Sequence, residues 1–160
     1  MTPPPTTPAK RILVVDDVPD VLSLFRDAAR RLRGFDAEVV TEVNAARAIE
    51  RLQRERFDVV LSDCRMREAD GIAVLSAARA ANPRGIRVLM TAYASIPADV
   101  GRVEGMGVDV YLHKPAPASD LLKLLRALLA EDAGVIGEKR DRARAIERAA
   151  RLAGDGVRIG

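Results

Sequence analysis

The stretch FDVVLSDCRM, residues 57–66, begins as a buried strand and ends in reactive side chains. Its apolar run, bounded by a turn signal, is typical of a strand that is covered on both faces of a sheet. Asp63 stands at the end of this run, where a carboxylate would emerge from the core. Three other apolar runs of the chain end in comparably reactive groups, so we expect Asp63 to belong to a site.

Short apolar runs alternate with helical patterns five times along the chain. Strands are expected at 11–17, 36–43, 57–63, 86–92 and 108–114, and helices at 18–32, from Ala45, at 71–81, near 97–105 and from about Ala118. The helix near 97–105 is weakened by the glycines of the 96–107 segment, because each glycine within a helix costs about 1 kcal/mol relative to alanine. Strict alternation of this kind predicts a parallel sheet with helices on both faces.

Length and composition limit the classes of protein to consider. The 160 residues, 48% of them hydrophobic, can bury one sizeable core but are too few for two full domains. A net charge of +3 is too small to indicate nucleic-acid binding, and the single cysteine, Cys64, excludes a disulfide framework and a multi-cysteine metal site. We find no membrane-length apolar stretch, and residues 1–9 are Pro/Thr-rich like an unfolded tail, so we expect a cytoplasmic protein without membrane contact.

Four of the expected strands end in groups that could share one crevice. The first ends in Asp16 and Asp17, the third in Asp63, the fourth in Thr91 and the fifth in Lys114. Ligands of open α/β sheets bind outside the carboxyl ends of the strands. One acid after a strand is most often a turn or helix-capping residue, but the joint arrangement indicates a site.

Three clustered carboxylates, a hydroxyl and an ammonium indicate phosphoryl transfer. The carboxylates repel one another, and hard oxygen ligands at a partly open site suit Mg²⁺. A carboxylate can also act as a nucleophile and become an aspartyl-phosphate. A bound cation, a lysine and a hydroxyl would then stabilise the charge on the transferring group.

Four motifs resemble the receiver domain of two-component response regulators. They are VVDD at 14–17, SDCRMREADG at 62–71, MTA at 90–92 and YLHKP at 111–115. Their order and spacing match that family from residue 10 to about 130. The resemblance implies a flavodoxin-like, doubly wound five-stranded parallel sheet of order 2-1-3-4-5 with five helices.

The resemblance also implies a role for individual residues. Asp63 would be the phosphoacceptor, and Thr91 and Lys114 would bind the phosphoryl group. Mg²⁺ would be held by Asp63, by Asp17 directly, by Asp16 mainly through water, and by the backbone carbonyl of Arg65. Tyr111 would be an aromatic switch residue. Arg65 and Tyr93 are expected to lean over the phosphoryl group and prolong its lifetime, and we expect Lys114–Pro115 to be cis.

The partners follow from the same resemblance. The phosphoryl donor would be a sensor histidine kinase or a phosphotransfer protein, and the domain would assist only its own phosphorylation and dephosphorylation rather than act as an enzyme. A downstream protein would bind the face formed by strand 5 and its flanking helices, and a homodimer is possible. MTAYAS at 90–95 is similar to receivers attached to transcriptional activators, so the chain could be the receiver part of a longer transcriptional regulator.

One residue departs from the family pattern, and other features argue against two alternative classes of protein. Arg67 stands where most receivers have proline after the DxxM segment. Cys64 is expected to be an inert packing residue, and His113 to point away from the crevice. A haloacid-dehalogenase-like phosphatase would need a D-x-D pattern after strand one, but Val18 and Pro19 occupy the second positions after Asp16 and Asp17. A pure scaffold would have no need of the full set of acids, threonine and lysine.

Residues 131–160 lie beyond the resemblance and are too few for an output domain. The stretch 138–153 is rich in good helix formers and predicts a helix. Acids interrupt its basic residues and it has no aromatic residue, which disfavours nucleic-acid binding. We expect this helix to lean on the domain or on a second copy of the chain, because an isolated helix of this length is marginal in water.

Overall fold

The computed structural model contains a parallel sheet with the predicted strand order. It describes residues 9–32, 37–64, 66, 71–91, 108–113, 118–130 and 157–159. The strands are β1 (Lys10–Val15), β2 (Ala37–Glu42), β3 (Val59–Asp63), β4 (Ile86–Thr91), β5 (Val110–His113) and β6 (Val157–Ile159). They are arranged as β2-β1-β3-β4-β5-β6, and β1 to β5 are parallel to one another. The expected order 2-1-3-4-5 is therefore confirmed.

The sheet has one strand more than the sequence analysis predicted. β6 comes from the 131–160 segment, for which a helix was the only predicted element, and it pairs with β5 in the antiparallel direction. Its three residues carry too short a pattern to be recognised without the neighbouring strand. The predicted helices at 97–105 and 138–153 lie outside the described residues.

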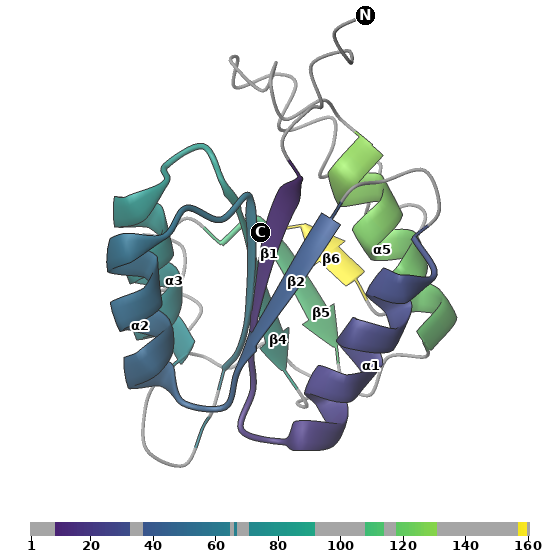
Figure 1. The fold of residues 1–160 in the computed structure, drawn as a ribbon, viewed down its shortest axis with the longest axis horizontal. Coiled ribbons are helices and arrows are strands. Elements are labelled where there is room, and N and C mark those ends of the chain that lie inside the picture. Colours follow the sequence, from purple (N-terminus) through teal and green to yellow (C-terminus); the bar gives the residue numbers. More distant parts are fainter. Residues whose placement is uncertain are drawn as a thin grey trace, which may run out of the picture.

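Four helices cover the two faces of the sheet in the described part of the chain. They are α1 (Pro19–Arg30), α2 (Ala45–Arg54), α3 (Gly71–Ala81) and α5 (Ala118–Ala130). Figure 1 shows α2 and α3 on one side of the sheet and α1 and α5 on the other. None of the described helices is long and apolar enough to cross a membrane.

Side-chain alternation along the strands gives each face its own core. In β1, Ile12 and Val14 join the cluster under α1 and α5, whereas Leu13 and Val15 join the cluster under α2 and α3. All four are completely buried. Successive side chains of a strand point to opposite faces, so a parallel strand between two helical layers must be apolar at nearly every position.

The helices begin where local chemistry favours a first turn. Pro19 is at the start of α1, where its missing N–H costs nothing, and Asp20 lies in the positively polarised first turn. Asn44 precedes α2, and its side-chain oxygen accepts a hydrogen bond from the Arg47 N–H at 3.2 Å. This cap satisfies one of the backbone donors that a helix start leaves open.

An ion-pair network joins α2 to β1 and β2. Glu55, just after α2, accepts hydrogen bonds from Arg11 of β1 at 3.1 Å and from Arg51 of α2 at 3.2 Å. Arg11 also binds Glu38 at 3.0 Å and lies 4.6 Å from the centre of the Phe57 ring. Arg51 binds Glu42 at 2.9 Å.

The two arginines lower the pKa of Glu55. Burial alone would raise that pKa, but the hydrogen bonds and charges of Arg11 and Arg51 outweigh this effect and bring it below the ordinary value of 4.5. A carboxyl group whose pKa is lower in the folded than in the unfolded state stabilises the fold above its unfolded pKa. That contribution is lost as the pH falls through the folded pKa.

Glu55→Gln should therefore lower the free energy of unfolding by about 1 kcal/mol at pH 7, since partly exposed pairs contribute little each and this carboxylate joins two. The difference from the unsubstituted protein should shrink as the pH falls below about 4.5, the ordinary pKa of this group. Urea unfolding at several pH values measures both effects. Glu50→Gln, on the exposed side of the same helix, is the matched control. An equal loss from both substitutions would contradict the network's role.

Candidate functional site

Three carboxylates meet at the carboxyl ends of the neighbouring strands β1 and β3. Val15 pairs with Ser62, so the next residues, Asp16 and Asp63, lie level with each other. One carboxylate oxygen from each of Asp16, Asp17 and Asp63 lies within 4.8 Å of the others. The structure thus brings together the three acids that were selected from the sequence.

The three acids differ in burial and in their local contacts. Asp16 is completely buried, Asp63 is 8% exposed and Asp17 is half-buried. The Oδ1 atom of Asp16 accepts a hydrogen bond from the Val18 N–H at 2.9 Å, and its own N–H donates to the Glu42 carbonyl at 3.1 Å. Asp16 therefore shapes the turn from β1 into α1, and this turn presents Asp17.

Thr91 lies on the other side of Asp63. β3 and β4 pair so that Asp63 is opposite Met90, which places Thr91 one residue further toward the same edge. The Cys64 N–H donates to the Met90 carbonyl at 2.8 Å and continues this pairing beyond the end of β3. Thr91 is 5% exposed and pairs in turn with His113 of β5.

Tyr111 and Cys64 belong to the core rather than to the crevice surface. Tyr111 of β5 is buried in the apolar cluster under α2 and α3. Cys64 is partly buried and packs against the same cluster, as expected for a packing residue.

Gly71 lies against the site, and the sequence analysis did not predict its packing role. Its N–H, at the start of α3, donates to the Cys64 carbonyl at 3.3 Å. A Cβ atom at this position would overlap the carbonyl oxygen of Asp63 and come within 3.0 Å of the Ser62 Oγ. Only glycine allows α3 to start this close to the end of β3, and the Asp-Gly pair before a helical pattern was the available signal.

Three predicted site residues lie outside the described residues: Arg65, Tyr93 and Lys114. Arg67 and the Lys114–Pro115 bond lie outside them too. The side-chain direction of His113 is likewise not described. The structure thus brings the three predicted acids together and places Thr91 at the end of the neighbouring strand.

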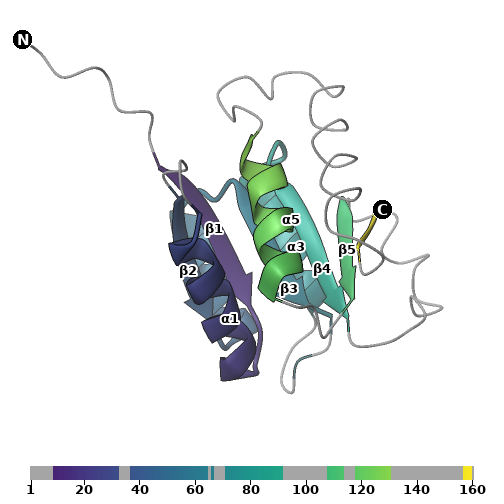
Figure 2. The same ribbon diagram turned by 90° about the vertical axis from the view of Figure 1, so that its right-hand side faces the viewer.

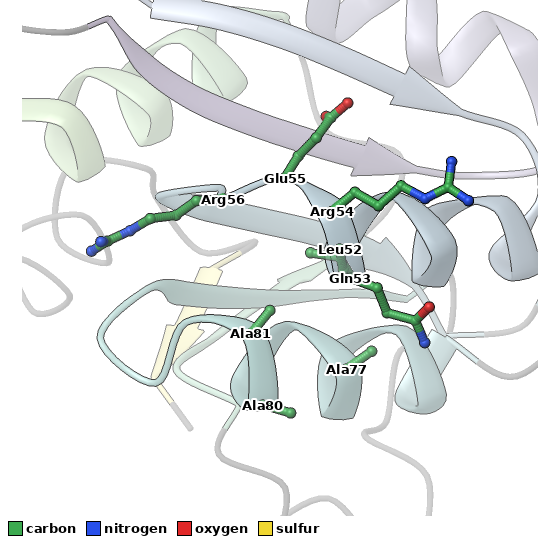
Figure 3. A pocket seen from close by; sticks show the side chains of 8 residues that line it. All are labelled: Leu52, Gln53, Arg54, Glu55, Arg56, Ala77, Ala80 and Ala81. Carbon is green, nitrogen blue, oxygen red and sulfur yellow. The ribbon is translucent and has the colours of Figure 1, made fainter.

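A shallow hollow of about 510 Å³ lies near the amino ends of the strands, away from the acidic site. It is formed by the end of α2 with the residues that lead into β3, and by the end of α3, which leads into β4. Figure 3 shows Arg54 and Arg56 extending in opposite directions, with Leu52, Ala77 and Ala81 between them. These segments precede the strands, whereas the carboxylates follow them, so this hollow is separate from the acidic site.

The donor set fits a hard divalent cation. Three carboxylates from two adjacent strands supply only oxygen atoms, and Mg²⁺ takes oxygen ligands while keeping several waters. A cation among them would offset their mutual repulsion, which is strong at such separations when water is partly excluded. The arrangement can hold a metal ion beside Asp63, and Thr91 ends the neighbouring strand on the other side.

The fold and the site together define the response regulator receiver domain. The model of that family matches residues 12–151, and the chain belongs to it. The family consists of phosphorelay signalling domains rather than classical enzymes, and Mg²⁺ is a general feature of it.

Individual relatives agree with this assignment. The chain is 35% identical over 127 residues to the transcriptional regulatory protein ZraR of Escherichia coli K12. The matched region covers 79% of this chain and 28% of that protein. It is 36% identical over 119 residues to the transcriptional regulatory protein PrrA of Mycobacterium tuberculosis, covering 74% of this chain and 49% of that protein. The chain thus spans about a quarter to a half of these relatives.

Among solved structures, the CheY-like receiver domain protein of Methanospirillum hungatei superposes with a TM-score of 0.67. The two are 28% identical, and the match covers 77% of this chain and 95% of that structure. The match therefore extends over nearly the whole of that receiver domain structure.

Gly71→Ala should destabilise the protein by on the order of 1–3 kcal/mol, the usual cost of overpacking. The sign of this change in the free energy of unfolding is informative, because replacing glycine by alanine in a helix normally stabilises a protein by about 1 kcal/mol. Gly85→Ala is the control, since its added Cβ would meet its neighbours only at 3.2–3.3 Å and should cost less. Urea unfolding compares the two. A stabilised Gly71→Ala protein would show that α3 is not held against Asp63.

Proposed function

We propose that this domain accepts a phosphoryl group on Asp63 and passes the signal to a protein partner. The observation that carries the proposal is the convergence of Asp16, Asp17 and Asp63 within 4.8 Å at the carboxyl edge of the sheet. The donor is the phosphohistidine of a cytoplasmic sensor histidine kinase or phosphotransfer protein, the donor class of this family.

The positions of the three acids favour Asp63 as the acceptor. Asp16 is completely buried, and one of its oxygens already holds the Val18 N–H. Asp63 ends the strand between β1 and β4, so its carboxylate has acids on one side and Thr91 on the other. A phosphoryl group on Asp63 would therefore lie between a cation site and a hydroxyl donor.

The transfer forms one bond and breaks another. A carboxylate oxygen of Asp63 attacks phosphorus, the new P–O bond forms as the P–N bond of the phosphohistidine breaks, and the departing imidazole takes up a proton. Asp16, Asp17, Asp63 and the backbone carbonyl of Arg65 would hold Mg²⁺, which supplies neutralisation of charge on the transferring group. Thr91 donates a hydrogen bond to a phosphoryl oxygen, and Lys114 supplies a second positive charge.

The switch proceeds through β5. When Thr91 turns toward the phosphoryl group, the space beside β4 and β5 changes, and Tyr111 responds by changing its rotamer. This changes the populations of two conformations only to the extent that the phosphoryl group interacts differently with them. A downstream protein, or a second copy of the chain, reads the face formed by β5 and its flanking helices.

The proposed organisation is a receiver domain at 10–130 with an N-terminal tail at 1–9 and an extension at 131–160. The curated relatives are longer transcriptional regulatory proteins, so the same proposal accommodates a chain that forms the receiver part of such a regulator.

Incubation with acetyl phosphate and Mg²⁺ should add one phosphoryl group per chain, detected by intact mass. Asp63→Asn should abolish the addition, because an amide is a poor nucleophile, and a chelator should abolish it in the unsubstituted protein. Asp20→Asn, an exposed acid in the first turn of α1, is the matched control and should be modified normally. Continuous turnover of the donor would indicate a phosphatase instead, and normal modification of Asp63→Asn would overturn the assignment of the acceptor.

The lifetime of the phosphorylated state should depend on Arg65 and Tyr93, two residues after Asp63 and Thr91. Bulky side chains there are expected to obstruct the hydrolytic water. The double variant Arg65→Ala/Tyr93→Ala should lose its phosphoryl group faster than the unsubstituted protein after the donor is removed. The decay of the phosphorylated mass with time measures this. Equal decay rates would show that these side chains do not protect the acyl phosphate.

A further inference from the structure

The two long edges of the parallel sheet are protected in different ways. β2, at one edge, carries Glu38 and Glu42, and the side chain of Glu38 is 56% exposed. Charged residues on an edge strand hinder the addition of a foreign strand. The last parallel strand, β5, has the sequence VYLH, and its first three residues are uncharged and buried. Without a neighbour it would offer an apolar edge of open hydrogen-bonding groups.

β6 supplies that neighbour. Val110, Tyr111 and Leu112 pair with Ile159, Arg158 and Val157 in antiparallel register. Figures 1 and 2 show β6, in yellow, alongside β5. Every other strand pair described in this sheet is parallel, as alternating strands and helices require. β6 is therefore an added strand rather than a further step of the alternation.

We propose that the outer edge of β5 is a strand-docking site, and that residues 157–159 occupy it and exclude partners. The class of partner is an extended peptide segment that adds to the sheet in the antiparallel direction, as β6 does. Such additions gain affinity from main-chain hydrogen bonds and specificity from alternate side chains. The sequence Val-Arg-Ile shows the kind of segment that this edge accepts.

The occupant is short enough to be displaced. In the part of the chain that the structure describes, three residue pairs join β6 to β5, and residues 131–156 separate β6 from the end of α5. A tethered segment competes through its effective concentration, which is in the millimolar range for short flexible linkers and falls as linkers lengthen. A partner with a longer or better-matched strand can therefore replace β6, whereas a weak one is excluded.

The position of this edge would connect docking to the phosphorylation site. β5 carries Tyr111, and its pairing with β4 joins His113 to Thr91. Docking at β5 does not itself require phosphorylation, but its use as the output surface rests on the proposed function.

The experiment uses the chain ended at residue 156, the full chain and the synthetic peptide GDGVRIG, residues 154–160. The backbone amide signals of Val110, Tyr111 and Leu112 are followed by NMR while the peptide is added. In the shortened chain these signals should differ from those of the full chain and move toward them as the peptide binds. The full chain should need at least roughly tenfold more peptide, because its own strand competes.

The control peptide carries prolines in place of Val157 and Arg158. Neighbouring residues of a strand direct their N–H groups to opposite sides, so one of the two prolines must remove a donor that faces β5. This peptide should leave the shortened chain unchanged. A full-length Val157→Pro/Arg158→Pro protein should behave like the shortened chain, which guards against an effect of chain length alone.

Three outcomes would overturn the proposal. They are identical β5 signals in the shortened and full chains, no response of the shortened chain to GDGVRIG, and an equal response to the two peptides. All samples are unphosphorylated, so any of these outcomes would leave the phosphorylation of Asp63 untouched, and a failure of phosphorylation would leave strand docking untouched.

Discussion

The constraint on which this site depends is the mutual repulsion of three carboxylates held within 4.8 Å of one another. The acids cannot attract each other into place, so the strands that carry them must fix their positions. β1 is held between the two helical layers by four completely buried side chains, those of Ile12, Leu13, Val14 and Val15. The buried residues of β3 hold the neighbouring strand in the same way. A slip of one residue would move every apolar side chain of a strand to the wrong face, which makes the register costly to change.

The two ends of the sheet serve different purposes. Where the strands begin, Glu55 joins Arg11 and Arg51, opposite charges meet, and the result is cohesion between α2 and β1. Where they end, like charges meet, and the result is a place for a cation and a phosphoryl group. Gly71 contributes to the second end, because the absence of its side chain lets α3 begin against the Asp63 carbonyl. The Arg51–Glu42 pair extends the same network to the last residue of β2, so stabilising contacts are present at both ends of the strands.

Much of this protein could be predicted from its sequence. The apolar runs that became β1, β3 and β4 are long enough to be recognised, and the start and end of α3 agree with the predicted 71–81. Asp16, Asp17, Asp63 and Thr91 could be selected because parallel strands carry their last residues to the same edge of the sheet. The family resemblance rested on the same residues, and the family match bears it out.

Tertiary structure decided what the local pattern could not express. The pairing of β6 with β5 joins residues 157–159 to a strand that lies far from them in the chain. The need for glycine at position 71 arises from the Asp63 carbonyl above it, a contact between β3 and α3 that no helix propensity encodes. The sequence by itself determined the alternation of strands and helices and the chemical groups at the strand ends, because periodicity and residue type are local properties. Their distances, and the covering of β5, were decided by packing, because they join residues far apart in the chain.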